Sequence, residues 1–309
     1  MRTRELWTKL LLYPGHTLPT AAAPVLVAVG LAIHDGVFAP LPALLAFLGS
    51  WLIHVAGVFM DNHELLRRHP GVAEHPELLA AVADRRLALS TLRWAIVGCI
   101  AASIGVGAYL LSIGGFAAVA IGLLGLAASL GYAAGPLPYA SRGWADLLFL
   151  LMFGVVAVVG AYYVQAVSLV AAPGPWTTRW IPLEATVYWI GLPAGGLVTC
   201  VLIVDDVRDR QWDRLKGWRT GAVRWGIGWS RVEFTLLVVL AYAAPFACWA
   251  LSGFTAWVLL PLATLPAAWA AVRAFRTHDS TAGLLEWTPR VALLSLAYSA
   301  LLALGLSVR

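Results

Sequence analysis

Long apolar runs, separated by short polar segments, occupy most of this 309-residue chain. Each run is close to the ~20 residues with which an α-helix crosses the apolar core of a bilayer. The segments between the runs are too short for a soluble domain, although residues 76–83 are predicted to form a short surface helix. The pattern predicts about nine transmembrane helices, at residues 17–34, 42–64, 90–112, 114–134, 145–168, 185–207, 231–252, 254–275 and 289–307. We therefore expect an all-α polytopic membrane protein with a single domain over residues 1–309.

The composition favours the same class of protein. Hydrophobic residues make up 61% of the chain and charged residues 12%, and the mean hydropathy is +0.80, which is too apolar for an average soluble domain. Residues 1–12 carry charges without a small-residue cleavage site, so no signal peptide is predicted. The three cysteines lie inside apolar runs without C-x-x-C spacing, and we interpret them as packing residues.

The positive charges are distributed unevenly between the two sides of the predicted bundle. With nine spans, all of the 21 lysines and arginines except Arg179 and Arg309 fall on the side of the N-terminus. Because cytoplasmic loops carry an excess of cations, this side is predicted to face the cytoplasm of a bacterial-type inner or plasma membrane. No contiguous basic face exists outside these loops, so the expected partner is the lipid bilayer and not a nucleic acid.

An acidic segment, residues 204–220, follows the predicted helix 185–207 on that cytoplasmic side. Asp206, Asp209 and Asp213 are spaced i, i+3 and i+7, so on a helix they share one face. Carboxylates on one face repel each other unless a cation lies between them, and Mg²⁺ bound to a substrate's diphosphate is a common solution. Asp205 is a further candidate ligand of the metal. The cations just downstream, Arg214, Lys216 and Arg219, suit the same phosphate, and Arg208 is a further candidate. The alternative is a solvated, salt-bridged helix end.

A second acidic group lies at the end of the predicted helix 42–64. Asp61 and Glu64 are spaced i, i+3, and Arg68 lies on the same face. An acidic residue within a transmembrane segment is a candidate for function and for metal binding. Alternatively, Asp61 or Glu64 pairs with Arg68 and only caps the helix.

The two acidic helix ends are separated by 145 positions (Asp61 to Asp206), which suggests two related halves, roughly 1–135 and 136–309. In that arrangement both acidic ends would meet at one central cavity. Arg142 is the only cation of the turn-rich loop after the predicted helix 114–134, and it is a candidate phosphate ligand.

Four blocks of sequence, taken together, resemble a known family. They are Thr17-Leu18-Pro19 with Ala23-Pro24-Val25-Leu26; Tyr132, Gly135-Pro136, Arg142-Gly143 and Asp146; Phe153-Gly154 with Tyr162-Tyr163-Val164-Gln165; and Val207-Arg208-Asp209, Asp213-Arg214, Gly217 and Arg219-Thr220. Over nearly its whole length the chain resembles the UbiA superfamily of intramembrane prenyltransferases, and most of all the dihydroxynaphthoate polyprenyltransferases of menaquinone synthesis.

The resemblance implies a helical bundle around a central cavity. Two aspartate-rich motifs would bind Mg²⁺ and the diphosphate of an allylic isoprenoid, and an aromatic acceptor would trap the allylic cation. Asp206, Asp209 and Asp213 match the second motif and, with Asp61, are the implied catalytic residues. Arg142, Lys216 and Arg219 match diphosphate contacts.

The first motif departs from the family pattern N-D-x-x-D-x-x-x-D. Met60 replaces the asparagine, Glu64 the second aspartate and Arg68 the third, so Arg68 could contact the diphosphate directly. Asp205 replaces an amide that is common in the similar branch, and could restore a carboxylate. Trp218 stands where a lysine is usual.

The leading hypothesis is a Mg²⁺-dependent enzyme that transfers a polyprenyl or shorter allylic group to an aromatic, naphthoate-like or phenol-like acceptor. A terpene cyclase on the same fold, which uses an allylic diphosphate without an acceptor, is an alternative. A non-catalytic membrane protein that binds isoprenoid or quinone is another. A transporter is weaker, because no charged residue lies mid-span in a second broken helix.

Overall fold

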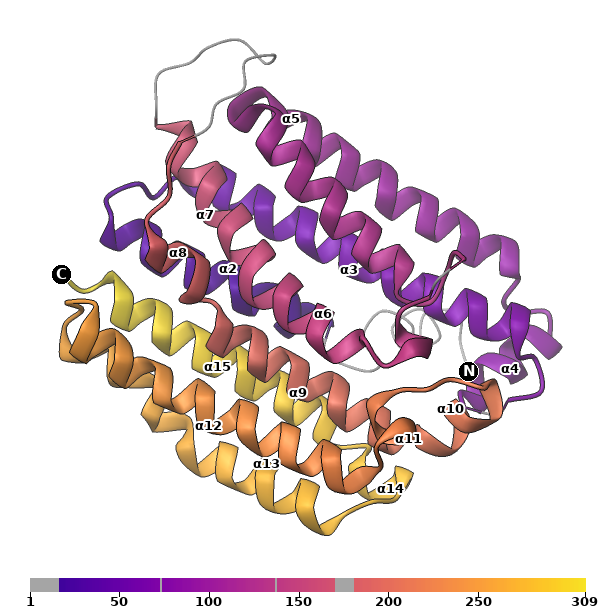
Figure 1. Ribbon diagram of the computed structural model, residues 1–309. Coiled ribbons are helices and arrows are strands. Elements are labelled where there is room, and N and C mark those ends of the chain that lie inside the picture. The colour runs from indigo at the N-terminus through magenta and orange to yellow at the C-terminus, as the bar shows by residue number, and fades with distance from the viewer. Residues whose placement is uncertain (1–16, 73, 137, 170–180) are drawn as a thin grey trace.

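The computed structural model describes residues 17–72, 74–136, 138–169 and 181–309. Helices make up most of these residues, and no strand forms within them. The longer helices run roughly alongside one another in a bundle (Figure 1). In chain order the helices are α2 (Thr17–His34), α3 (Pro40–Arg68), α4 (Pro76–Ala83), α5 (Leu89–Gly131), η1 (Ala140–Arg142), α6 (Ala145–Leu151), the π-helical segment η2 (Met152–Val156), α7 (Ala157–Ser168), α8 (Ala185–Trp189), α9 (Leu192–Arg208), α10 (Arg210–Lys216), α11 (Gly221–Arg224), α12 (Ile227–Leu251), η3 (Ala256–Thr264), α13 (Leu265–Thr277), α14 (Thr281–Leu284) and α15 (Trp287–Ser307).

Eight helical segments of the described chain are long and apolar enough to cross a membrane, and the longest of them, α5, contains two predicted spans. Gly115 interrupts α5 with φ 61° and ψ −154°, a conformation that favours glycine. The chain folds back there, because Ile96 and Leu130 pack in the same hydrophobic cluster, whereas a straight helix would hold them about 50 Å apart. Figure 1 shows the two arms of α5. The prediction of an all-α membrane bundle is confirmed, and about nine spans is a close count.

Several predicted boundaries are also confirmed. The helix at Thr17–His34 and the span Ala145–Ser168 have the predicted limits, and the short surface helix α4 covers residues 76–83 as predicted. The prediction of two related halves stays a prediction.

The acidic segment is not one continuous helix. α9 ends at Arg208, Asp209 has non-helical dihedral angles (φ −98°, ψ 5°), and α10 begins at Arg210. Aspartate has a low intrinsic preference for the interior of a helix, which agrees with a break at this position. The Asp209 carboxylate accepts hydrogen bonds from the side chain of Arg208. The break turns α10 across the end of the bundle without removing Asp213 from the face that the spacing predicted.

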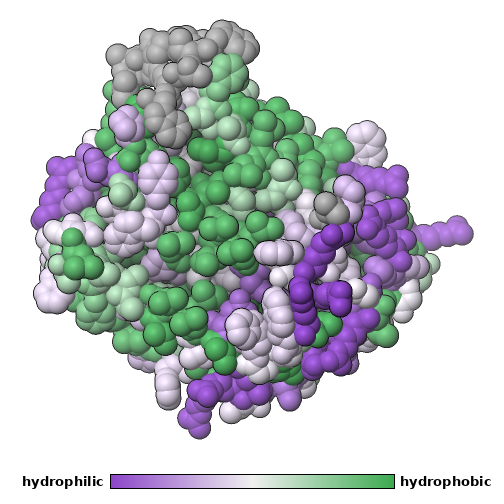
Figure 2. All heavy atoms as spheres, in the orientation of Figure 1, coloured by the Kyte–Doolittle hydropathy of each residue, from purple (hydrophilic) through white to green (hydrophobic). Residues whose placement is uncertain are grey.

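Hydrophobic residues form a broad band across the face shown in Figure 2. Most of the hydrophilic residues in this view gather at the end at which Figure 1 places α4, α10 and α11, and a smaller hydrophilic group lies at the opposite edge. Arg309 is one of the two cations predicted to lie on the non-cytoplasmic side. It donates a hydrogen bond to the carbonyl of His34, the last residue of α2 (2.7 Å). The polarity of the bundle therefore agrees with the predicted separation of charge.

Helices α9 and η2 cross with their backbones in contact. A Cβ atom at Gly195 would lie 2.5 Å from the backbone nitrogen of Gly154, which is shorter than any real contact. Small residues allow such close approach between membrane helices. This crossing fixes the distance between the acidic end of α9 and the side chains that α6 and η2 present.

We expect Gly195→Ala to lower the melting temperature of the protein in detergent by several degrees, because the added methyl group overpacks the crossing at a cost of about 1–3 kcal/mol. Gly105→Ala on α5 is the matched control, since nothing lies within 4 Å of a Cβ atom at that position. Equal melting temperatures for the two variants would contradict the close crossing.

Candidate functional site

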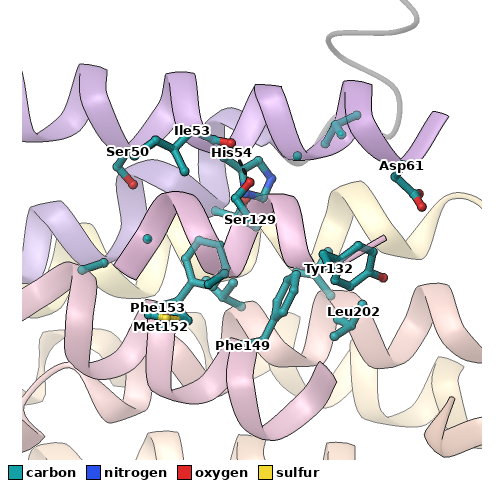
Figure 3. Close-up of a pocket in the computed structure, with 18 of the residues that line it drawn as sticks. Ser50, Ile53, His54, Asp61, Ser129, Tyr132, Phe149, Met152, Phe153 and Leu202 are labelled. Atoms are coloured by element: carbon teal, nitrogen blue, oxygen red, sulfur yellow. Dashed lines mark hydrogen bonds between the residues drawn. The ribbon is translucent and has the colours of Figure 1, made fainter. Parts of the chain in front are cut away.

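A cavity of about 710 Å³ lies between α3, α5, the α6–η2–α7 segment and α9. One end is acidic and lies where the chain leaves α3 and α9. The rest is mainly apolar, with walls from both arms of α5 (Val106, Leu110, Ile121) and from α9 (Val198, Leu202). Figure 3 shows part of these walls, with Asp61 at one end of the view and Ser50 toward the other.

The acidic end brings the two predicted motifs together. Among the residues that the structure describes, seven carboxylates line the cavity and two cationic side chains, Arg208 and Lys216, do so. Seven minus two leaves a formal excess of five negative charges in a partly enclosed space. The carboxylates are Asp61, Glu74, Glu77, Asp205, Asp206, Asp209 and Asp213. The expectation that Asp61 and the carboxylates of the 204–220 segment share one cavity is therefore met in the geometry.

Arg208 neutralises two of these carboxylates. Its buried guanidinium lies 2.5 Å from Asp205 and forms a paired contact with Asp209. Thr288 of α15 completes the group, because its hydroxyl accepts a hydrogen bond from Arg208 (2.9 Å) and donates one to Asp205 (2.5 Å). Arg208 thus holds the end of α9 to α15 and keeps both carboxylates at the cavity.

Lys216 connects α10 with the loop between α3 and α4. Its Nζ atom lies 2.6 Å from Glu74 and 3.0 Å from Asp213, and it also lies 4.1 Å from the ring centre of Trp218. Burial lowers the pKa of Lys216, but Glu74 and Asp213 outweigh it and raise this pKa overall, so the lysine stays charged. Burial raises the pKa of Asp213 to about 6, against the opposing effect of Lys216.

Glu64 is held by neighbours on its own helix. Its carboxylate lies 2.6 Å from Arg67 and 2.5 Å from Arg68, and it also contacts His63 (3.0 Å). The pairing of Glu64 with Arg68 is the alternative that the spacing left open. Glu64 and Arg68 line a small pocket of about 30 Å³, which shares Asp61, Glu74 and Lys216 with the main cavity.

Two of the predicted phosphate ligands lie outside the cavity lining. Arg142 and Arg219 are exposed, and neither lines the cavity. They belong to adjacent loops, because the backbone N–H of Arg219 donates to the carbonyl of Ser141 (2.9 Å). The structure therefore joins the backbones of their two loops outside the cavity lining, while Arg208 and Lys216 are the cations of the described chain that reach the carboxylates.

Sequence patterns did not identify every residue at the acidic end. Glu74, His75 and Glu77 line the cavity from the polar loop and from the start of α4. Burial lowers the pKa of His75, which favours its neutral form. Thr288 was missed as well. Only the polar character of the loop could have indicated Glu74, because its partner Lys216 is 142 positions away.

Aromatic rings line the cavity next to the acidic end. Tyr132, at the end of α5, lies 5.8 Å from Phe149 of α6, which lies 5.2 Å from Phe153 of η2. His54 of α3 packs against Phe153 edge to face, with ring centres 5.7 Å apart. Figure 3 shows these four rings between α3 and the α6–η2 segment.

The donors at the acidic end suit Mg²⁺ together with a phosphate-bearing ligand. They are carboxylate oxygens, which hard cations prefer. No group of three or more His, Cys, Asp or Glu side chains in the described chain is arranged to hold a metal ion by itself. Mg²⁺ is usually held by one or two carboxylates and completes its shell with phosphate oxygens and water. The arrangement therefore fits a metal that binds with a diphosphate.

Comparison with known proteins identifies the family. The model of the UbiA prenyltransferase family matches residues 21–296. The chain belongs to the UbiA prenyltransferase family. It is thus a prenyltransferase by family membership, as the four sequence blocks predicted, and its fold makes it an integral membrane protein.

Curated and solved relatives agree with this assignment. The 1,4-dihydroxy-2-naphthoate octaprenyltransferase of Escherichia coli is 29% identical over 267 residues, which cover 81% of this chain and 79% of the relative. A UbiA homolog from Aeropyrum pernix K1 shares the fold with a TM-score of 0.60 at 17% identity, over 93% of this chain and 96% of the homolog. A UbiA homolog from Archaeoglobus fulgidus, solved with GPP and Mg²⁺, has a TM-score of 0.54 at 16% identity, over 95% of this chain and 99% of the homolog.

We expect Arg208→Met to lower the melting temperature of the protein without ligands by on the order of 10 °C, because it leaves Asp205 and Asp209 without their cation at a cost of about 3 kcal/mol. Thr288→Val should have a smaller effect in the same direction. Arg214→Met, at an exposed position of α10, removes the same charge and should change the melting temperature little. A melting temperature of Arg208→Met equal to that of the control would show that the pairing contributes no stability.

Proposed function

We propose that this protein transfers an isoprenyl group from an allylic diphosphate to an aromatic acceptor, with Mg²⁺ bound to the diphosphate. The observation that carries the proposal is the form of the cavity: one end presents carboxylates from both motifs, and the rest is an apolar space between membrane helices. A diphosphate with a hydrocarbon chain has the same division into a charged end and an apolar remainder.

The charge at the acidic end explains the need for a metal. A bare diphosphate is an anion and would be repelled by a site at which the described side chains carry a formal excess of five negative charges (seven carboxylates against two cations). Divalent cations between the carboxylates and the diphosphate remove that repulsion. Mg²⁺ would be held by Asp61, Asp206, Asp209 and Asp213, with Asp205 and Glu64 as further carboxylates.

The cationic side chains would then act on the diphosphate. Lys216 and Arg208 already lie at the cavity, and each would have a donor available for the diphosphate if Mg²⁺ were bound to one of the carboxylates that it now contacts. Arg68 lies in the small pocket that shares Asp61 and Lys216 with the cavity, so it is a second contact for the diphosphate. Arg142 and Arg219 are exposed and do not line the cavity, so they would contact the diphosphate only from outside its present lining.

The reaction needs departure of the leaving group and protection of the allylic cation from water. When bound, Mg²⁺ supplies charge that stabilises the departing diphosphate. Lys216 and Arg208 place further positive charge beside it. The apolar walls exclude water, and the faces of the rings of Tyr132, Phe149 and Phe153 are suited to the positive charge that develops on the isoprenyl carbon.

The relatives support the choice of substrates. The curated relatives are named as octaprenyltransferases of dihydroxynaphthoate, and solved homologs hold GPP or DMAPP with Mg²⁺. We infer a naphthoate-like acceptor, as in the menaquinone branch of quinone synthesis, and a phenol-like one as the alternative. The uneven distribution of cations favours an acidic end that faces the cytoplasm.

The proposal predicts that diphosphate release requires an acceptor. Protein in detergent with Mg²⁺ and geranylgeranyl diphosphate should release diphosphate and form a prenylated product when dihydroxynaphthoate is added, and neither without it. Asp206→Asn should reduce the rate by at least about 100-fold, because a buried carboxylate at the cavity is lost. Asp279→Asn, at an exposed position, is the matched control.

Three other outcomes would redirect the assignment. Diphosphate release without acceptor, together with a cyclic hydrocarbon or alcohol, would favour the terpene cyclase. Binding without release would favour an isoprenoid-binding protein. Full activity of Asp206→Asn would contradict the role of the second motif.

A further inference from the structure

Polar side chains also line the cavity beyond its acidic end, among them Ser50, Ser129 and His54. Of these, His54 packs against an aromatic ring of the cavity wall, whereas the Ser129 hydroxyl donates to the carbonyl of Ile53. His54 belongs to the apolar part of α3, seven residues before Asp61, so the two positions lie on the same face and about 10 Å apart along the helix. Polar side chains inside a membrane span are costly and mark functional positions. The imidazole of His54 lines the cavity at a depth that the diphosphate, held at the carboxylates, does not reach.

His54 also forms one end of a wall of rings. Phe153 packs at 5.7 Å and 72° against it, Phe149 lies 5.2 Å beyond, and Tyr132 closes the series 5.8 Å further on, beside the acidic end. All four line the cavity, and Figure 3 shows them between α3 and the α6–η2 segment. The wall thus extends from the carboxylates to the imidazole of His54.

We propose that this wall is the binding site of the aromatic acceptor, with His54 as the hydrogen-bond partner of the acceptor's hydroxyl or carboxylate. The inference rests on the proposed prenyl transfer and goes beyond it by assigning residues to the second substrate. The isoprenyl chain has no polar group that an imidazole could bind, whereas a phenol or naphthoate has hydroxyl and carboxylate groups. Aromatic rings favour offset or edge-to-face packing against a planar ligand.

The position of the wall agrees with the geometry of the transfer. The ring of Tyr132 lies next to the acidic end, so the start of the wall is near the place where the carbon–oxygen bond of the diphosphate breaks. The part of the cavity that both arms of α5 line is mainly apolar and includes Gly122 and Gly125, which leave room for hydrocarbon. An acceptor on the wall and a chain along α5 would lie side by side.

The test measures binding of each substrate separately. The acceptor probe is 1-hydroxy-2-naphthoate, which keeps a hydroxyl and a carboxylate but does not oxidise to a quinone, and the diphosphate probe is geranyl thiolodiphosphate with Mg²⁺, which binds without ionising. The naphthoate affinity is measured by its fluorescence with the diphosphate probe present. The variants are His54→Leu, His54→Gln and Phe153→Leu, with His34→Leu as the matched control at the far end of α2.

We expect His54→Leu to weaken naphthoate binding about tenfold, as for the loss of one hydrogen bond. His54→Gln should retain affinity within about threefold, and Phe153→Leu should weaken binding about fivefold. Affinity for the Mg²⁺–diphosphate probe should stay within twofold in all of them, which also shows that each variant folds. His34→Leu should leave both affinities unchanged.

Unchanged naphthoate affinity in His54→Leu would overturn the inference, and so would an equal loss of affinity for both probes. Binding of the diphosphate probe alone by the unaltered protein would overturn it too, while leaving the diphosphate site in place. If neither probe binds, the proposed function fails first, and the inference with it.

Discussion

The concentration of carboxylates at the membrane border is the constraint on which the rest of the site depends. Two helix ends and one loop direct acidic side chains into one cavity, and such a group is unstable unless positive charge lies within it. In the protein alone, Arg208 and Lys216 supply part of that charge, and both reach across the fold, to Thr288 of α15 and to Glu74 of the loop after α3. The same contacts that neutralise the acids therefore hold distant parts of the chain together. The charge that remains uncompensated is what makes the cavity suitable for metal and diphosphate.

The apolar part of the bundle sets the distance between the carboxylates at the acidic end and the aromatic rings of the cavity. Close contact between the backbones of α9 and η2 at Gly154 and Gly195 places the acidic end of α9 beside the rings of Phe149 and Phe153. The fold of α5 at Gly115 brings two further walls to the same space. Glycine is needed at these places for different physical reasons, close approach in one case and positive φ in the other. Together they form a cavity whose carboxylates and cations lie at one end.

Hydrophobic runs of about 20 residues predicted the spans well, because length and polarity alone decide whether a helix crosses a membrane. The i, i+3, i+7 spacing also predicted which carboxylates share a face, even though α9 ends before Asp209. The partners of those carboxylates could not be predicted from the sequence. Lys216 and Glu74 are brought together by tertiary packing across 142 positions, and no periodic pattern marks a loop residue.

The first motif illustrates a second limit. The spacing placed Glu64 and Arg68 on one face but left open whether Glu64 binds metal or arginine, and the structure pairs it with Arg67 and Arg68. The sequence pattern does not mark His54 as functional, because a single histidine in an apolar run is usually a packing residue. Its meaning depends on its neighbours across the cavity, and these come from α5, α6 and η2.

Isothermal titration of the purified protein with Mg²⁺ and geranyl thiolodiphosphate, separately and together, tests the central claim most directly. No three carboxylates in the described part of the chain form a ready metal site, and the acidic end should repel a bare diphosphate. Neither component should therefore bind with measurable heat at millimolar concentration on its own. Together they should bind as a saturable complex, one diphosphate per chain. Tight binding of Mg²⁺ alone, or of the diphosphate without any divalent cation, would contradict the account.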